Sequence, residues 1–112
     1  MLRLIKVKKI LSKLRILMDI STSSNTVTIT GNIKSVSDFQ SIKSSVDEVK
    51  ESNSTVIIVI KESLSITSSV IGYFNKLVLK DKINLQMRVG NTQLLDLLDE
   101  LSLMQVFKAT KI

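Results

Sequence analysis

The sequence predicts an α/β domain in which a small, mostly parallel mixed β-sheet has helices packed on it. Segments with the two-residue period of strands alternate along the chain with segments of helical period. The most apolar segment, residues 55–60, is a β-branched run of the kind that forms a central strand. With 112 residues, of which 44% are hydrophobic, the chain can close one modest core.

Residues 18–30 have the pattern of a β-hairpin. Apolar and polar side chains alternate from Met18 to Ile20, and a polar cluster at 21–25 supplies the turn. Residues 26–30 then alternate apolar side chains with β-branched polar ones, which is typical of a half-buried strand. The segment therefore predicts two antiparallel strands at the start of the domain.

A helix is predicted to follow. Ser35 is a suitable N-cap, and Asp38 three residues later completes an approximate capping box. Apolar residues then recur at steps of three and four, which gives one stripe for burial against the sheet. The stripe consists of Val36, Phe39, Ile42, Val46 and Val49. Polar residues at 52–54 end the helix.

Residues 55–60 are apolar after the first position, and such a run indicates a strand that is covered on both faces. A polar connector leads to a second predicted helix over about 68–79. Its apolar stripe consists of Val70, Ile71, Phe74, Leu77 and Val78. Residues 83–89 alternate again between apolar and polar side chains, which predicts a strand with one buried face.

A third helix is predicted after Gly90, with Asn91 or Thr92 as its cap. Its stripe consists of Leu94, Leu97, Leu98 and Leu101. Val106 and Phe107 then either add a last edge strand or dock the tail. Because single helices separate successive strands, the connections must be crossovers, and crossovers of this kind are right-handed.

The residue types that are absent exclude several kinds of site. Without histidine or cysteine the chain cannot build a Ser–His–Asp triad, a disulfide or a zinc site based on these ligands. Asp96, Asp99 and Glu100 lie among the leucines of a predicted helix, a context typical of a solvated face. The three glycines are isolated and form no phosphate-binding loop. We therefore expect no catalytic residue, no metal ligand and no cofactor.

The net charge of +6 belongs to one end of the chain. Residues 1–17 carry six basic residues and no acid, and the other ten basic residues are matched by all ten acidic ones. The chain is therefore divided into a basic extension, 1–17, and a neutral domain, 18–112. A neutral body argues against a nucleic-acid-binding domain, which has a basic face. The longest apolar run, 56–60, is too short to cross a bilayer, and we expect a cytoplasmic protein.

The extension has several interpretations. On a helix, its apolar residues would share one face with several lysines opposite. These residues are Leu4, Val7, Ile10, Leu11, Leu14 and Leu17. A basic amphipathic helix of this kind lies on an anionic membrane or in a partner's groove. The same residues could supply a further strand or form a poorly ordered tail, and Met18 could be the natural start. Membrane contact is expected only through residues 1–17.

Three motifs together resemble the STAS domains, which are named for sulphate transporters and anti-sigma-factor antagonists. Residues 66–72, Ile-Thr-Ser-Ser-Val-Ile-Gly, resemble the family's strand-to-helix signature, a hydrophobic residue followed by Asp-Ser-Ser-Gly. Residues 30–34 resemble its early Thr/Ser-Gly-x-Leu-Asp turn, and residues 94–107 resemble its last helix and closing strand. The spacing of the three motifs agrees with the family over about residues 18–108.

The resemblance implies a STAS-like fold and a protein-binding role without catalysis. STAS domains bind kinase-type anti-sigma factors, transporter subunits or one another. In anti-sigma antagonists the partner kinase reversibly phosphorylates a serine at a helix start, which matches Ser68 here, with Thr67 and Ser69 as alternatives. The partner-binding residues implied in this way are Asn32, Ile33, Lys34, Thr67, Ser68, Ser69, Val70 and Ile71.

The first functional hypothesis is a regulator in a bacterial partner-switching circuit. The alternative is a STAS subunit of a membrane transporter complex that docks on its ATPase subunit, and a small ligand-binding domain is a remote third. The chain departs from the family signature at Thr67, Val70 and Lys34, where the family has Asp, Gly and Asp. The hydroxyls at 67–69 are also ordinary capping groups for a helix.

Overall fold

The computed structural model describes residues 18–112, so every expectation about the extension 1–17 lies outside the described residues. Within residues 18–112 strands and helices alternate along the chain. The strands are β1 (Asp19–Ser23), β2 (Thr26–Thr30), β3 (Thr55–Ile60), β4 (Asn84–Val89) and β5 (Ala109–Lys111). The helices are α2 (Val36–Lys50), α3 (Ser68–Leu79) and α4 (Thr92–Glu100). None of these helices is long and apolar enough to cross a membrane.

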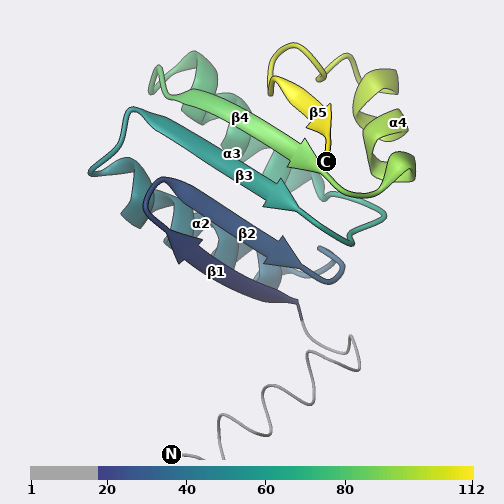
Figure 1. Ribbon diagram of the computed structural model, residues 1–112, viewed down its shortest axis with the longest axis horizontal. Coiled ribbons are helices and arrows are strands. Elements are labelled where there is room, and N and C mark those ends of the chain that lie inside the picture. The colour runs from purple at the N-terminus through teal and green to yellow at the C-terminus, as the bar shows by residue number, and fades with distance from the viewer. Residues whose placement is uncertain (1–17) are drawn as a thin grey trace, which may run out of the picture.

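The five described strands form one mixed sheet in the order β1-β2-β3-β4-β5 (Figure 1). β1 pairs antiparallel with β2, and every later pair is parallel. The predicted class, a small mostly parallel mixed sheet with helices packed on it, is confirmed. Because the order of the parallel strands never reverses, the sheet has no topological switch point, the place where open α/β sheets bind ligands.

Within residues 18–112 helices cover one face of the sheet and leave the other open. Buried and partly exposed side chains alternate along β2, β3 and β4. Figure 1 shows α2 and α3 behind the sheet, and no described helix covers the face toward the viewer. The prediction that β3 is covered on both faces is wrong, because successive right-handed crossovers in one direction place their helices on one side. Ile57 and Val59 therefore stay partly exposed on the open face.

Local signals in the sequence determine where the helices begin. Ser35 Oγ accepts a hydrogen bond from the Asp38 N–H at 3.0 Å, and the Asp38 carboxylate accepts one from the Ser35 N–H at 3.1 Å. The predicted capping box is thus confirmed. The Asn91 side chain caps α4 in the same manner by accepting from two backbone N–H groups of its first turn. Phe107 docks into the core, and the last strand begins only at Ala109.

The chain's three phenylalanines and one tyrosine form a continuous row of ring contacts within the described residues. Phe39 of α2 meets Tyr73 of α3 edge-on, with ring centroids 6.3 Å apart. Tyr73 lies 5.8 Å from Phe74, and Phe74 lies 5.9 Å from Phe107 near the C-terminus. Phe74 is fully buried, as predicted. The row joins three separate segments of the chain, α2, α3 and the segment before β5. Each such pair contributes about 0.5–1.5 kcal/mol beyond the burial of its rings.

A charged cluster at the rim of the helix layer also joins α2 to α3. The Tyr73 hydroxyl donates to Asp47 Oδ1, and Lys43 Nζ lies 2.8 Å from Asp47 Oδ2. Lys50 Nζ lies 3.5 Å from Asp47 and 3.3 Å from Asp81. Burial acts to raise the pKa of the Asp47 carboxyl, but the hydrogen bonds from Lys43 and Tyr73 outweigh it and hold that pKa below its usual value. Burial, together with the bond to Asp47, raises the pKa of the Tyr73 hydroxyl.

The lowered pKa of Asp47 predicts a stability contribution that disappears in acid. A group whose pKa is lowered by folding stabilises the protein above its unfolded pKa, about 3.9 for Asp, and loses that effect as pH falls through the folded value. We expect Asp47→Asn to unfold at lower denaturant concentration than wild type at neutral pH, with the difference shrinking below about pH 3.9. Glu48→Gln, an exposed neighbour on α2, is the control. A difference independent of pH would contradict the ionic role.

Candidate functional site

The candidate site lies at the edge of the sheet where the parallel strands end. The connections from β2 to α2 and from β3 to α3 both leave from this edge, so residues 31–35 and 61–67 become neighbours. The antiparallel strand β1 begins at the same edge, because Asp19 is paired with Thr30. The edge therefore brings together residues 30–34 and 66–72, two of the three motifs that resemble STAS domains.

Two cross-loop hydrogen bonds fasten these connections to each other. The Ser63 hydroxyl is fully buried, accepts from the Ile33 N–H at 3.0 Å and donates to the Ser65 carbonyl at 2.6 Å. Next to it, the Asn32 side-chain oxygen accepts from the Leu64 N–H at 3.0 Å. A buried polar group without a partner costs free energy, so each bond fixes the separation of the two loops. Sequence reasoning missed Ser63, which appeared only as one serine in a serine-rich connection.

The start of α3 has one occupied hydroxyl and two that point to solvent. Thr67 is the N-cap, and its Oγ1 accepts from the Val70 N–H at 3.3 Å. Ser68 and Ser69 are the first two helical residues, and both are exposed. The first turn contains no acidic residue. Its free N–H groups and the positive end of the helix dipole therefore face outward without a built-in negative charge.

The eight partner-binding residues implied by the resemblance divide between surface and interior. Ile33 and Val70 have no exposed surface, so they support the loops from beneath and cannot contact a partner in this conformation. Asn32 is exposed, but its side-chain oxygen is engaged by the neighbouring loop. Lys34 is exposed, and Ile71 is partly buried. Of the hydroxyl residues in this set, Ser68 and Ser69 are exposed, and Thr67 is partly buried with its hydroxyl engaged as the cap.

The structure adds two apolar residues to this surface. A shallow hollow between the start of α2 and the start of α3, which we call the tip hollow, is lined by Lys34, Ser35, Val36, Phe39, Thr67 and Ser69. Val36 is 72% exposed, and Phe39 is partly buried. Both were predicted as the first members of the buried stripe of α2. The first turn of α2 extends beyond the core, so the stripe is buried only from Ile42 onward.

Gly72 extends the exposed side of α3 beside the tip hollow. It lies one helical turn after Ser68 and Ser69 and is exposed. A Cβ added at Gly72 would meet no atom within 4 Å, so no internal packing requires glycine here. Glycine inside a helix costs about 1 kcal/mol relative to alanine. Glycine therefore leaves this part of the α3 surface without a protruding side chain, and this absence does not stabilise the fold.

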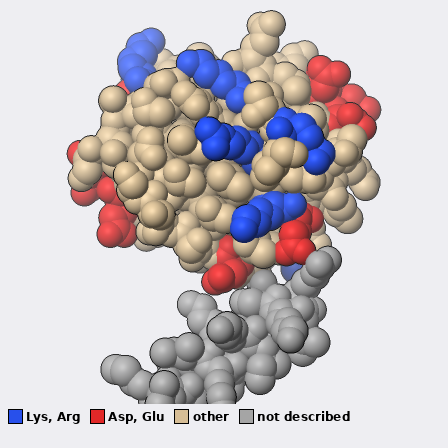
Figure 2. All heavy atoms as spheres, viewed as in Figure 1, with Lys and Arg blue, Asp and Glu red and all other residues tan. Residues whose placement is uncertain are grey.

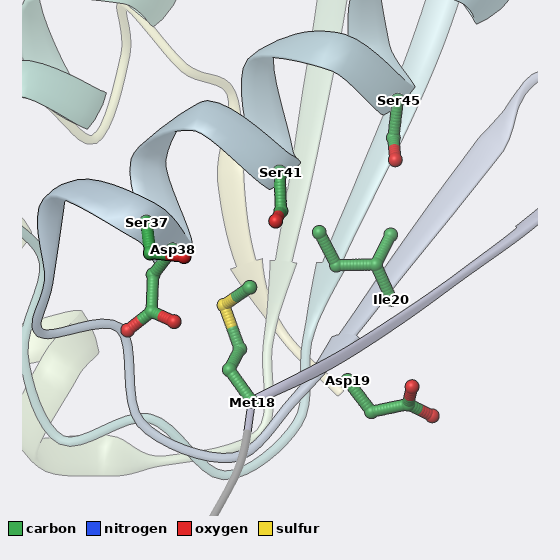
Figure 3. A pocket seen from close by; sticks show the side chains of 7 residues that line it. All are labelled: Met18, Asp19, Ile20, Ser37, Asp38, Ser41 and Ser45. Carbon is green, nitrogen blue, oxygen red and sulfur yellow. The ribbon is translucent and has the colours of Figure 1, made fainter. Parts of the chain in front are cut away.

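Other surfaces of the described domain have less specific chemistry. Between β1 and α2, Met18 and Ile20 extend toward the helix, as Figure 3 shows, and hydroxyl groups form the opposite wall. These hydroxyls belong to Ser37, Ser41 and Ser45. Figure 2 looks onto the open face of the sheet, where Lys and Arg side chains are scattered among mostly uncharged residues. Within residues 18–112 no group of acidic side chains is arranged to hold a metal ion.

Comparison of the chain with models of protein families, with curated proteins and with solved structures finds no match. The resemblance to STAS domains therefore stays a prediction from the sequence motifs. The observed class and element order are compatible with such a fold.

The buried Ser63 hydroxyl predicts a large difference between two neighbouring serines. Ser63→Ala leaves the Ile33 N–H and the Ser65 carbonyl without their partner, and we expect a loss of about 1–3 kcal/mol in the free energy of unfolding. Ser65→Ala is the matched control, because the Ser65 side chain is exposed and its carbonyl is retained. Denaturant unfolding of both variants measures the effect. Equal stabilities would show that Ser63 does not fasten the loops.

Proposed function

We propose that this chain is a non-catalytic, protein-binding regulatory domain of the anti-sigma-factor antagonist type, which acts in the cytoplasm of a bacterium. Its partner would be a kinase-type anti-sigma factor or a related signalling protein. The observation that carries the proposal is the tip of α3. Exposed hydroxyls, unpaired helix N–H groups and a protruding valine lie at the starts of two helices, and a buried serine fastens the loops that lead into them.

The tip hollow has the chemistry of a protein-binding surface. Val36 and Phe39 provide apolar area that a partner would remove from water, which is the main favourable term in association. The exposed backbone N–H groups and Ser68 provide donors around it. The surface is shallow, and the sheet lacks the crevice at a switch point in which α/β proteins bind small ligands. A shallow surface that mixes apolar area with hydrogen-bond donors is better suited to bind a protein than a small molecule.

Phosphorylation of Ser68 would act as an off-switch at this surface. Thr67 already serves as the cap, so a modified Ser68 is not needed to hold the helix. A phosphoryl group adds about 1.5–2 negative charges, which the N-terminal end of α3 favours. Lys34, which carries the opposite charge, lines the tip hollow together with Thr67 and Ser69, the two neighbours of Ser68 in the chain. The same group would obstruct a partner that contacts Val36 and the helix tip.

Gly72 gives a test that leaves the fold intact. We expect wild-type protein to retain its partner in a pull-down from native lysate, and Gly72→Arg to lose it, because the long side chain stands beside the tip hollow. Ser52→Arg, at an exposed position after α2, is the control for added bulk and charge. Thermal unfolding should show that Gly72→Arg is at least as stable as wild type, since the glycine costs about 1 kcal/mol in a helix.

The switch is tested separately with the captured partner and ATP. We expect one phosphoryl group per chain by intact-mass analysis, located at Ser68, none in Ser68→Ala, and loss of partner binding in the modified protein. Ser69→Ala should still be modified. Capture of a transporter ATPase, with no modification, would favour the transporter-subunit hypothesis. Identical partners for wild type and Gly72→Arg would contradict a binding role for the tip of α3.

A further inference from the structure

Helix α4 has two apolar sides, of which only one is packed. Leu94 and Leu98 are fully buried against the core. On the other side, Leu97 is partly buried and Leu101 is 47% exposed. Leu64, from the connection between β3 and α3, is 46% exposed and lines a hollow together with Leu97. These three leucines form an outward-facing apolar surface, which we call the α4 groove.

Acidic side chains border the α4 groove. Asp96 and Glu100 line it, and Asp99 is the next exposed acid on the helix. The last turn of α4 contains no basic residue. Carboxylates near the C-terminal end of a helix are unfavourable because they lie next to the negative end of its dipole. In Figure 2 acidic side chains gather on the side of the molecule where Figure 1 places α4.

We propose that residues 1–17 of the same chain dock in the α4 groove. The segment and the groove are complementary in charge, and both are partly apolar. The segment combines apolar residues at helical spacing with six basic residues and no acid. The groove combines exposed leucines with two acids, Asp96 and Glu100, and the last turn of α4 has no basic residue. Opposite potentials on facing surfaces select a partner and reject others, and the apolar contact adds the favourable burial.

The segment is long enough to reach the groove from its point of attachment. Residue 18 precedes β1 at the edge where the parallel strands end, and α4 begins at the same edge after β4. Four strand spacings, about 19 Å, separate β1 from β5. If residues 12–17 are extended they span about 20 Å, which leaves residues 1–11 to lie in the groove. No unfolding of the described domain is therefore needed for docking within one chain.

Two other exposed surfaces fit the segment less well. The open face of the sheet carries Arg88 and Lys108, and basic side chains are scattered across it in Figure 2, so it repels a segment of charge +6. The hollow between β1 and α2 is lined by Met18 and Ile20 with three serines and two acids, but one of these acids, Asp38, already accepts two backbone N–H bonds at the start of α2. Neither surface combines negative charge with several exposed leucines. The inference does not depend on the function proposed for the tip of α3.

Paramagnetic relaxation in the full chain tests the docking. The chain contains no cysteine, so Ser12→Cys carries a nitroxide label at a single position. The nitroxide weakens the NMR signals of nearby backbone amides. We expect the strongest weakening at Leu64 and along α4, and little weakening around Glu48 at the far end of α2. In Asp96→Lys/Glu100→Lys the losses at α4 should disappear. Both acids are exposed, and lysine suits the end of a helix, so this variant should fold at least as well as wild type.

A charge-matched variant and a mixed sample complete the design. Glu48→Lys/Glu51→Lys makes the same change in net charge on exposed residues elsewhere, and it should keep the losses at α4. Losses at α4 should also fall in about 1 M salt, where charges are screened within about 3 Å. Losses elsewhere, or losses unchanged by the α4 variant, would overturn the proposal. In the mixed sample, one copy carries the nitroxide and the other copy carries the isotope label for NMR. Signal losses at α4 in that sample would show that a second copy's segment occupies the groove instead.

Discussion

The buried hydroxyl of Ser63 is the interaction on which the arrangement of the site depends. It bonds at once to the Ile33 N–H of one loop and to the Ser65 carbonyl of the other. The two loops lead into α2 and α3, so their separation fixes where both helices begin. The hollow between these helix starts exists because the loops cannot separate without leaving buried polar groups unpaired.

Below the loops, the positions of the helices are fixed by contacts among side chains of different segments. The row of rings from Phe39 to Phe107 crosses the helix layer, and the ion cluster around Asp47 closes its rim. The first turn of α2 extends past these contacts, which is why Val36 remains in water. The same packing leaves α4 with a second apolar side, because Leu94 and Leu98 already fill its place against the core.

Much of the fold could be predicted because its signals are local. The capping box at Ser35, the alternation along β4 and the helical stripe of α3 each depend on residues close in sequence. The coverage of β3 was mispredicted, since a continuous apolar run does not reveal on which side the crossover helices lie. Whether Val36 is buried depends on how far α2 extends beyond the sheet, which periodicity does not specify.

The candidate site was predicted in part for the same reason. The helix start at residues 67–69 follows from a local pattern of hydroxyls, and the structure places it at the surface. Ser63 could not be identified, because its partner Ile33 lies 30 residues away in the chain. The burial of Ile33 and Val70 likewise results from the meeting of two loops. Contacts between distant segments thus determine which of the recognised residues can touch a partner.

Hydrogen exchange at the Ile33 amide tests most directly whether the two loops form one rigid unit. This N–H donates to a buried side chain and belongs to a loop, whereas the Lys61 N–H donates to the Ile29 carbonyl where β2 and β3 end. The account predicts that the Ile33 amide exchanges about as slowly as the Lys61 amide. Exchange of Ile33 at the rate of an exposed loop amide would contradict it.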